Sequence, residues 1–329
     1  MISSRNTTID FLRGLAVVLM IFIHATAYFL NQKYVYVLWD YSHFVVPLFI
    51  FCSAYVAFQR KDATSISFTQ IFKRLRRLLV PYYIFTVVLM LLFGFVLHKE
   101  VSYQFILNWL LLGSGRDVGW LVALFVYVIF LIPIIVRAAK FLLLGNFLIK
   151  IVWLIPILLL FSPPIASFRL MMWAPWAAFL IFVYWFVQNE EKRWFPWNVL
   201  VLFTVGFLLS RFILISSNHT LVFTENKYPP NFYYLSYGIV IITLLYYFHR
   251  FLTMKKLFAS WLQKWFDFLS RHSYSLFFIH FLYVYILKDL VDYRRLQWWG
   301  FFGMVLLLSI ITQMVINKAH LIVKGIIPK

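Results

Sequence analysis

The stretch from Thr7 to His24 constrains this chain most, because it is apolar enough to cross a membrane and yet contains Asp10, Arg13 and His24. Arg13 and His24 are eleven residues apart, which on an α-helix leaves them roughly 20° apart around the axis and ~16 Å apart along it. Asp10 lies about one turn before Arg13, close enough to hold its charge. Ionisable side chains are costly at such depth, so a functional role is the expected one. The stretch predicts a membrane helix with an acid–base pair near its entry and an imidazole beyond its midpoint.

The composition of the whole chain supports a membrane protein. Of its 329 residues, 64% are hydrophobic, 22% are aromatic and only 12% are charged. Repeated apolar runs of about 17 to 25 residues fit helices that cross a ~30 Å hydrocarbon core, and the short alternating strands of a β-barrel are not seen. The sequence therefore predicts an all-α, polytopic integral membrane protein with one transmembrane domain over residues 1–329. A cleaved signal peptide is not expected, and the single cysteine, Cys52, excludes an internal disulfide or a cysteine zinc site. We expect no metal.

We predict ten spans from the apolar runs, with boundaries uncertain by several residues. They lie near residues 8–30, 38–59, 78–97, 118–136, 147–162, 170–187, 197–216, 232–249, 273–289 and 298–317. Two further segments, 103–112 and 257–269, are too short or too amphipathic to span, and we expect them to lie on the membrane surface.

The distribution of positive charge predicts the topology. A net charge of +19 could indicate nucleic-acid binding, but in a polytopic protein the side on which Lys and Arg lie matters more. Twenty of the thirty Lys and Arg residues fall on the side of the N-terminus, nine fall on the other side, and Arg13 lies within a span. This division predicts a multi-pass protein of the cell (cytoplasmic) membrane with both termini cytoplasmic and no nucleic-acid partner.

His24 is the first candidate for chemistry. A neutral imidazole can take a proton from a hydroxyl and so activate it as a nucleophile, and it can also carry an acyl group. The alternative is a structural histidine satisfied by a hydroxyl or carbonyl of a neighbouring helix. The presence of Arg13 on the same stripe favours the functional interpretation.

Arg74 and Arg77 belong to a basic run just before the third predicted span. Basic residues at that position commonly anchor lipid headgroups. Two guanidinium groups three residues apart on one helical face could instead bind phosphates. We favour phosphate binding, because Arg13 starts from the same side of the membrane.

Ser273 and His280 stand at the entrance of the ninth predicted span. They are seven residues apart and so share a face, with His280 roughly 10 Å into the helix. His280 could line a cofactor cavity or tie two helices together, and the sequence does not separate these alternatives.

Five segments in this order resemble the acyltransferase family 3 membrane proteins, which O-acylate bacterial surface glycans. The segments are Asp10-Phe11-Leu12-Arg13-Gly14 with His24, Val46 to Tyr55, Arg74-Leu75-Arg76-Arg77 with Pro81-Tyr82, Gly119-Trp120-Leu121, and Ser273 to His280. The resemblance covers the whole chain. The sequence departs from the family pattern at Ala54, where glycine is usual. We also see no counterpart of the esterase-like soluble domain that some members carry. We therefore expect transfer within the membrane domain or with a partner protein.

The resemblance implies a transferase that takes an acyl group, usually acetyl, from cytoplasmic acyl-CoA and delivers it to a hydroxyl of a cell-envelope or lipid-linked glycan. In this interpretation His24 is the general base, with a transient acyl-histidine as a variant. Asp10 orients Arg13, which with Arg74 and Arg77 neutralises donor phosphates, and Ser273 and His280 contribute to the cofactor site. The expected partners are the lipid bilayer, the glycan acceptor and other envelope-biosynthesis proteins.

The competing hypothesis is a transporter or flippase for a glycan intermediate or a small anion. Buried Arg and His residues also mark permeation and proton-relay routes. Transporters commonly contain paired half-repeats, and the sequence shows no repeat, which counts against this alternative without removing it.

Overall fold

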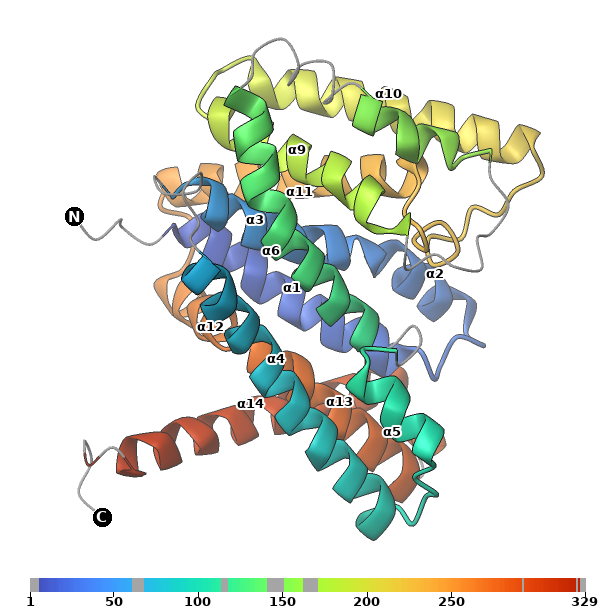
Figure 1. Cartoon of the computed structure of the whole chain (residues 1–329), viewed down its shortest axis with the longest axis vertical. Coiled ribbons are helices and arrows are strands. Elements are labelled where there is room, and N and C mark those ends of the chain that lie inside the picture. The colour runs from blue at the N-terminus through green and yellow to red at the C-terminus, as the bar shows by residue number, and fades with distance from the viewer. Residues whose placement is uncertain are drawn as a thin grey trace. The chain divides into compact units, whose positions relative to one another are not determined.

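The computed structural model describes residues 6–60, 68–113, 118–140, 151–161, 171–291, 293–323 and 325. Within these ranges every regular element is a helix (Figure 1). Seven helices of the described part are long and apolar enough to cross a membrane. The all-α polytopic fold is confirmed, while the number of ten spans stays a prediction.

Most helices coincide with the predicted spans, whereas α4 begins at Phe68, well before the predicted start near residue 78. Their bounds are α1 Thr7–Thr26, α3 Val45–Phe58, α4 Phe68–Leu91, α6 Gly119–Lys140, α9 Trp173–Asn189, α10 Phe195–Ser216, α11 Phe232–Met254, α13 Ser273–Leu290 and α14 Trp298–Val323. The predicted span near 147–162 is described only at residues 151–161, of which 151–158 are helical. The two short segments form α5 (Tyr103–Leu110) and α12 (Ser260–Arg271).

The second predicted span differs from the expectation of one continuous helix. It consists of α2 (Lys33–Tyr41), a 3-10 turn (Ser42–Phe44) and α3. Ser42 donates its hydroxyl to the carbonyl oxygen of Leu38 at 2.6 Å, a local bond that competes with the backbone ladder. Pro47 follows in the first turn of α3, where its missing N–H is tolerated. One helix therefore ends and another begins beside the polar residues Asp40, Ser42 and His43, although Lys33–Phe58 together form one candidate membrane span.

The chain forms two compact units. The first unit contains Met1–Ser42, Ile84–Ser102 and Lys256–Lys329, and the second contains His43–Tyr83 and Tyr103–Lys255. Helix α4 contributes residues to both units. A single domain over residues 1–329 stays a prediction.

In the first unit, α1 packs against α12, α13 and α14. Contacts between α13 and α14 pair the start of one helix with the end of the other, since Ser275 donates to Gln313 and His272 lies 3.1 Å from Asn317. Helix α1 runs parallel to α13, because Asp10 meets Ser270 and, further along, His24 meets His280. The start of α1 and the end of α14 therefore lie at the same end of this unit.

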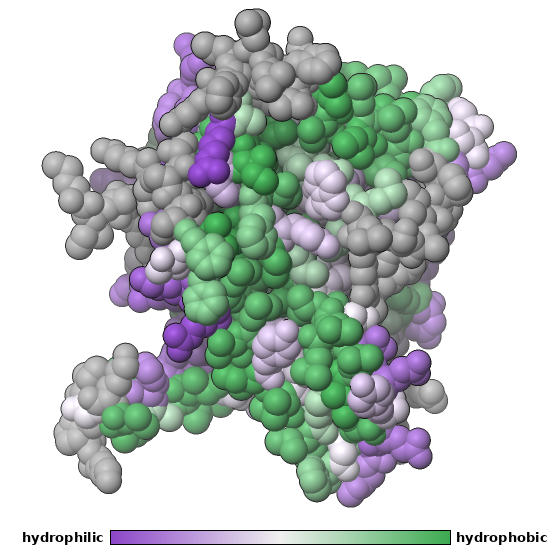
Figure 2. Space-filling model, in the orientation of Figure 1, coloured by the Kyte–Doolittle hydropathy of each residue, from purple (hydrophilic) through white to green (hydrophobic). Residues whose placement is uncertain are grey.

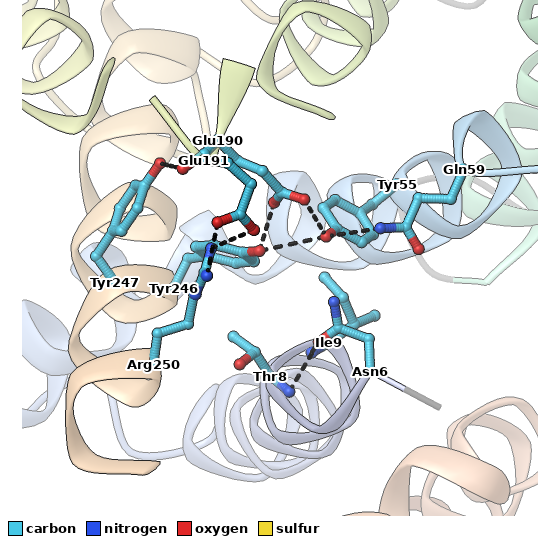
Figure 3. Close-up of polar contacts among 10 residues, drawn as sticks. All are labelled: Asn6, Thr8, Ile9, Tyr55, Gln59, Glu190, Glu191, Tyr246, Tyr247 and Arg250. Carbon is cyan, nitrogen blue, oxygen red and sulfur yellow. Dashed lines mark hydrogen bonds and ion pairs between the residues drawn. The ribbon is translucent and has the colours of Figure 1, made fainter. Parts of the chain in front are cut away.

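Helix α12 approaches α1 very closely at Gly14. A Cβ atom on Gly14 would lie 2.7 Å from the backbone oxygen of Phe266 and 2.9 Å from its ring. Such contacts are too short for any side chain, so the absence of a Cβ allows the two backbones to meet. Upstream, the side chain of Asn6 caps α1 by accepting hydrogen bonds from the backbone N–H groups of Thr8 and Ile9 (Figure 3).

In the second unit, α3, α9 and α11 meet in a polar cluster at their C-terminal ends (Figure 3). The buried carboxylate of Glu190 accepts hydrogen bonds from the hydroxyl groups of Tyr55, at 2.7 Å, and Tyr246. Beside it, Arg250 pairs with Glu191 through both guanidinium nitrogens at 3.1 Å. The three helices are thereby fixed in parallel.

Burial raises the pKa of Glu190, which follows the last residue of α9, and the hydrogen bonds from Tyr246 and Tyr55 oppose the rise. This carboxyl is accordingly easier to protonate than an ordinary glutamate.

The outer surface of several helices is apolar. Helix α10 exposes large hydrophobic side chains along most of its length, and the exposed apolar residues of α4 add to them. Figure 2 shows hydrophobic colouring over these helices. Such a surface is expected where lipid replaces water.

Candidate active site

Two histidines from distant parts of the chain meet inside the first unit. Nδ1 of His24, near the end of α1, lies 3.0 Å from Nε2 of His280 in α13. The two rings are stacked, with centroids 5.1 Å apart and planes inclined by 27°. His280 is fully buried and His24 is half-buried. The pair therefore presents one imidazole to its surroundings and keeps the other inside the helix bundle.

Hydrogen-bond partners determine which nitrogen of each neutral ring carries the proton. Nδ1 of His280 lies 3.1 Å from the carbonyl oxygen of Leu276. A carbonyl oxygen only accepts, so His280 carries its proton on Nδ1 and accepts through Nε2. His24 must then donate through Nδ1, which leaves the basic lone pair on its Nε2. The arrangement resembles the way a second group orients a catalytic imidazole in hydrolases.

The environment of the pair is apolar. The ring of Phe281 lies 4.4 Å from the rings of both His24 and His280. At the end of α1, Trp39 donates its indole N–H to the carbonyl oxygen of Ile23 at 2.8 Å, which satisfies one of the last carbonyls of the helix. Low polarity strengthens the electrostatic effect of any charge that forms on the imidazole.

Asp10 has a partner that the sequence interpretation did not identify. The hydroxyl of Ser270, at the end of α12, donates to the Asp10 carboxylate at 2.7 Å, and both side chains are buried. The only sequence signal was that Ser270 opens the polar segment before α13. Arg13 lies one turn further along α1 and is half-buried. Along α1, Asp10 with its hydrogen bond from Ser270 comes first, Arg13 follows, and His24 with its partner His280 comes last.

The remaining predicted residues fall in two places. Ser273 is half-buried at the first position of α13, in the same unit as His24. Arg74 and Arg77 lie on the part of α4 that belongs to the second unit, where Arg74 is half-buried and Arg77 is exposed. His24 and His280 are therefore in contact within the first unit. Arg74 and Arg77 belong to the second unit.

Comparison with known protein families identifies the chain. A family model for the acyltransferase domain, that of acyltransferase family 3, matches residues 6–317. The chain belongs to acyltransferase family 3. No curated protein and no solved structure matches it. Together with its apolar helices, the match makes the protein a membrane acyltransferase.

Within this acyltransferase, the His24–His280 pair is suited to proton transfer. The alternative for His24 was a neighbouring hydroxyl or carbonyl, and the partner shown by the structure is a second imidazole. Through this contact His280 joins α13 to α1, and its predicted place in a cofactor cavity stays a prediction. In the acyltransferase the same contact also selects the tautomer of His24, a consequence that spacing along one helix could not reveal.

Proposed function

We propose that this acyltransferase moves an acyl group, with acetyl as the expected one, from cytoplasmic acyl-CoA to a hydroxyl of a cell-envelope or lipid-linked glycan. The observation that carries the proposal is the contact between His24 and His280. It supplies an oriented neutral imidazole within a bundle of apolar helices, and a general base of this kind is what activation of a hydroxyl requires.

The proposed reaction proceeds as follows. Nε2 of His24 takes the proton of the acceptor hydroxyl as its oxygen attacks the carbonyl carbon of the thioester. The carbon–sulfur bond then breaks, and the thiolate of coenzyme A receives the proton from the His24 imidazolium. The products are an ester and free coenzyme A, and the histidine returns to its starting state. A variant, in which His24 itself carries the acyl group between donor and acceptor, uses the same nitrogen.

The donor is proposed to bind from the cytoplasmic side. Arg74, Arg77 and Arg13 neutralise its phosphates, and guanidinium groups suit this role because they form paired hydrogen bonds to phosphate oxygens. Asp10, anchored by Ser270, orients Arg13. Ser273 and His280 contribute to the wall along which the acyl-pantetheine arm reaches His24.

Mass spectrometry of cell-envelope glycans, with and without the gene, tests the function. The proposal expects a mass difference of one acyl group per modified sugar, restored by the wild-type gene and not by one encoding His24→Asn. Glycans that are fully acylated but lie on the wrong side of the membrane would instead support the transporter hypothesis. Identical glycans on the same side in both strains would contradict both.

A further inference from the structure

An aromatic cluster lies in the first unit just past the C-terminal end of α1, the end near which His24 lies. Tyr28 lies four residues after His24, just past the end of α1, and Tyr293 lies in the 3-10 turn between α13 and α14. Their ring centroids are 5.7 Å apart. Phe29 and Phe301 are buried beside these two tyrosines. The ring centroid of Phe29 lies 5.8 Å from that of Tyr293 and 5.9 Å from that of Phe301. The cluster therefore consists of two buried phenylalanine rings and two half-exposed tyrosine rings.

Lys288 adds a positive charge to this cluster. Its ammonium group, in the last turn of α13, lies 5.1 Å from the centre of the Tyr28 ring. The adjacent Asp289 forms an ion pair with Lys99, so its charge is already balanced. Lys288 is half-buried, which leaves part of its side chain accessible beside the two tyrosines.

The position of this cluster relative to the proton-accepting atom is what suggests a role. His24 lies in the last turn of α1, and Tyr28 follows two residues after Thr26, the last residue of that helix. The cluster therefore begins at the end of α1 that carries His24. An acceptor whose hydroxyl reached His24 would extend its ring towards Tyr28 and Tyr293. Aromatic rings stack on the apolar faces of sugars, and an ammonium group donates hydrogen bonds to oxygen substituents and favours negative ones.

We propose that Tyr28, Tyr293 and Lys288 form the acceptor subsite, which binds one sugar ring of the glycan by stacking while Lys288 holds an oxygen substituent of that ring. This inference rests on the proposed function and deepens it by assigning the acceptor side. It differs from a simple membrane-interface belt, in which Tyr and Lys residues would anchor the helix ends without contacting substrate.

The test uses the full chain in lipid nanodiscs, with acetyl-CoA as donor. The acceptor probe is envelope glycan isolated from a strain that lacks the gene, after removal of its esters with mild alkali. Tyr28→Ala and Tyr293→Ala should each raise the KM for this glycan roughly tenfold, which corresponds to about 1.4 kcal/mol. Lys288→Met should raise it at least ~3-fold and reduce its dependence on salt. The kcat at saturating glycan and the Kd for coenzyme A should change less than ~2-fold.

Two control variants sharpen the result. Tyr28→Phe keeps the ring and should retain a nearly normal KM. Trp299→Ala, at a residue that is 63% exposed near the start of α14, should leave the KM unchanged. An unchanged KM in the three test variants, with a lowered melting temperature, would assign the cluster to membrane anchoring and overturn the inference while leaving the acyltransferase function intact. Failure of the wild-type protein to acylate the probe would instead overturn the glycan acceptor and the subsite together.

Discussion

Nδ1 of His24 and Nε2 of His280 lie 3.0 Å apart although 256 positions separate them along the chain. The contact links α1, which carries Asp10 and Arg13, to the interior of α13. It also fixes the tautomer of His24, because His280 is committed to donating to Leu276. A single contact thus determines both helix pairing and proton placement.

Replacement of His24 tests the general base directly. His24→Asn keeps some hydrogen bonding but cannot take a proton, so acyl transfer per folded molecule should fall by at least ~10²-fold while coenzyme A still binds. Glycan acylation and the melting temperature are measured together, with His320→Asn on the exposed last turn of α14 as control. Near-normal acylation by His24→Asn would remove His24 from the mechanism.

Replacement of His280 tests its role as a positioning residue. His280→Leu removes the acceptor for Nδ1 of His24 and should lower kcat by ~10- to 10²-fold, because the wrong tautomer or ring orientation becomes accessible. His280→Gln offers an amide oxygen in its place and should recover part of the loss. If both variants lose the same activity in proportion to lost folded protein, His280 acts only as a helix tie.

The donor site is tested by Arg74→Ala combined with Arg77→Ala. Two lost charge-assisted contacts to phosphate, at ~1.5–3 kcal/mol each before solvent screening, should weaken coenzyme A binding more than tenfold. Calorimetric titration of the purified protein measures this change. The matched control is Lys73→Ala with Arg76→Ala, which removes the same charge from exposed positions of the same helix. Equal effects of the two pairs would indicate general electrostatic attraction or lipid anchoring.

Glu190 makes stability depend on pH. Since burial raises its pKa, the folded state binds this proton more tightly than the unfolded state does. Its contribution is present at low pH and is lost as pH rises from the ordinary glutamate value through the raised one. Glu190→Gln should flatten this fall in the melting temperature, whereas Glu191→Gln, at the neighbouring carboxylate that pairs with Arg250, should not. Parallel pH profiles for wild type and Glu190→Gln would refute the assignment.

Much of the fold could be predicted from the sequence because membrane spans are long apolar runs with a fixed minimum length. The boundaries of α10 and α14 illustrate this, since both begin within two residues of the predicted position. The break between α2 and α3 was missed, because the polar residues Asp40, Ser42 and His43 at the break do not by themselves distinguish a helix end from a continuous span.

The site could be predicted only in part. Helical spacing places Asp10, Arg13 and His24 on one stripe, and the chemistry of each side chain follows from its type. Contacts between helices depend on which helices are neighbours, and a single sequence contains no measure of that. The bond from Ser270 to Asp10 and the tautomer imposed by His280 therefore emerged only from the structure.

The distance along the chain between α1 and its polar partners has a consequence for biogenesis. At the usual pace of ~5–20 residues/s, the ribosome needs roughly 10–50 s to proceed from His24 to His280. Throughout that interval Asp10, Arg13 and His24 are already made, while Ser270 and His280 do not yet exist. The nascent helix must be sheltered by insertion machinery or by a chaperone until α12 and α13 emerge. Chains that stall before α12 contain α1 with its ionisable side chains but without the hydrogen bonds with Ser270 and His280. Such chains are expected substrates of membrane quality control.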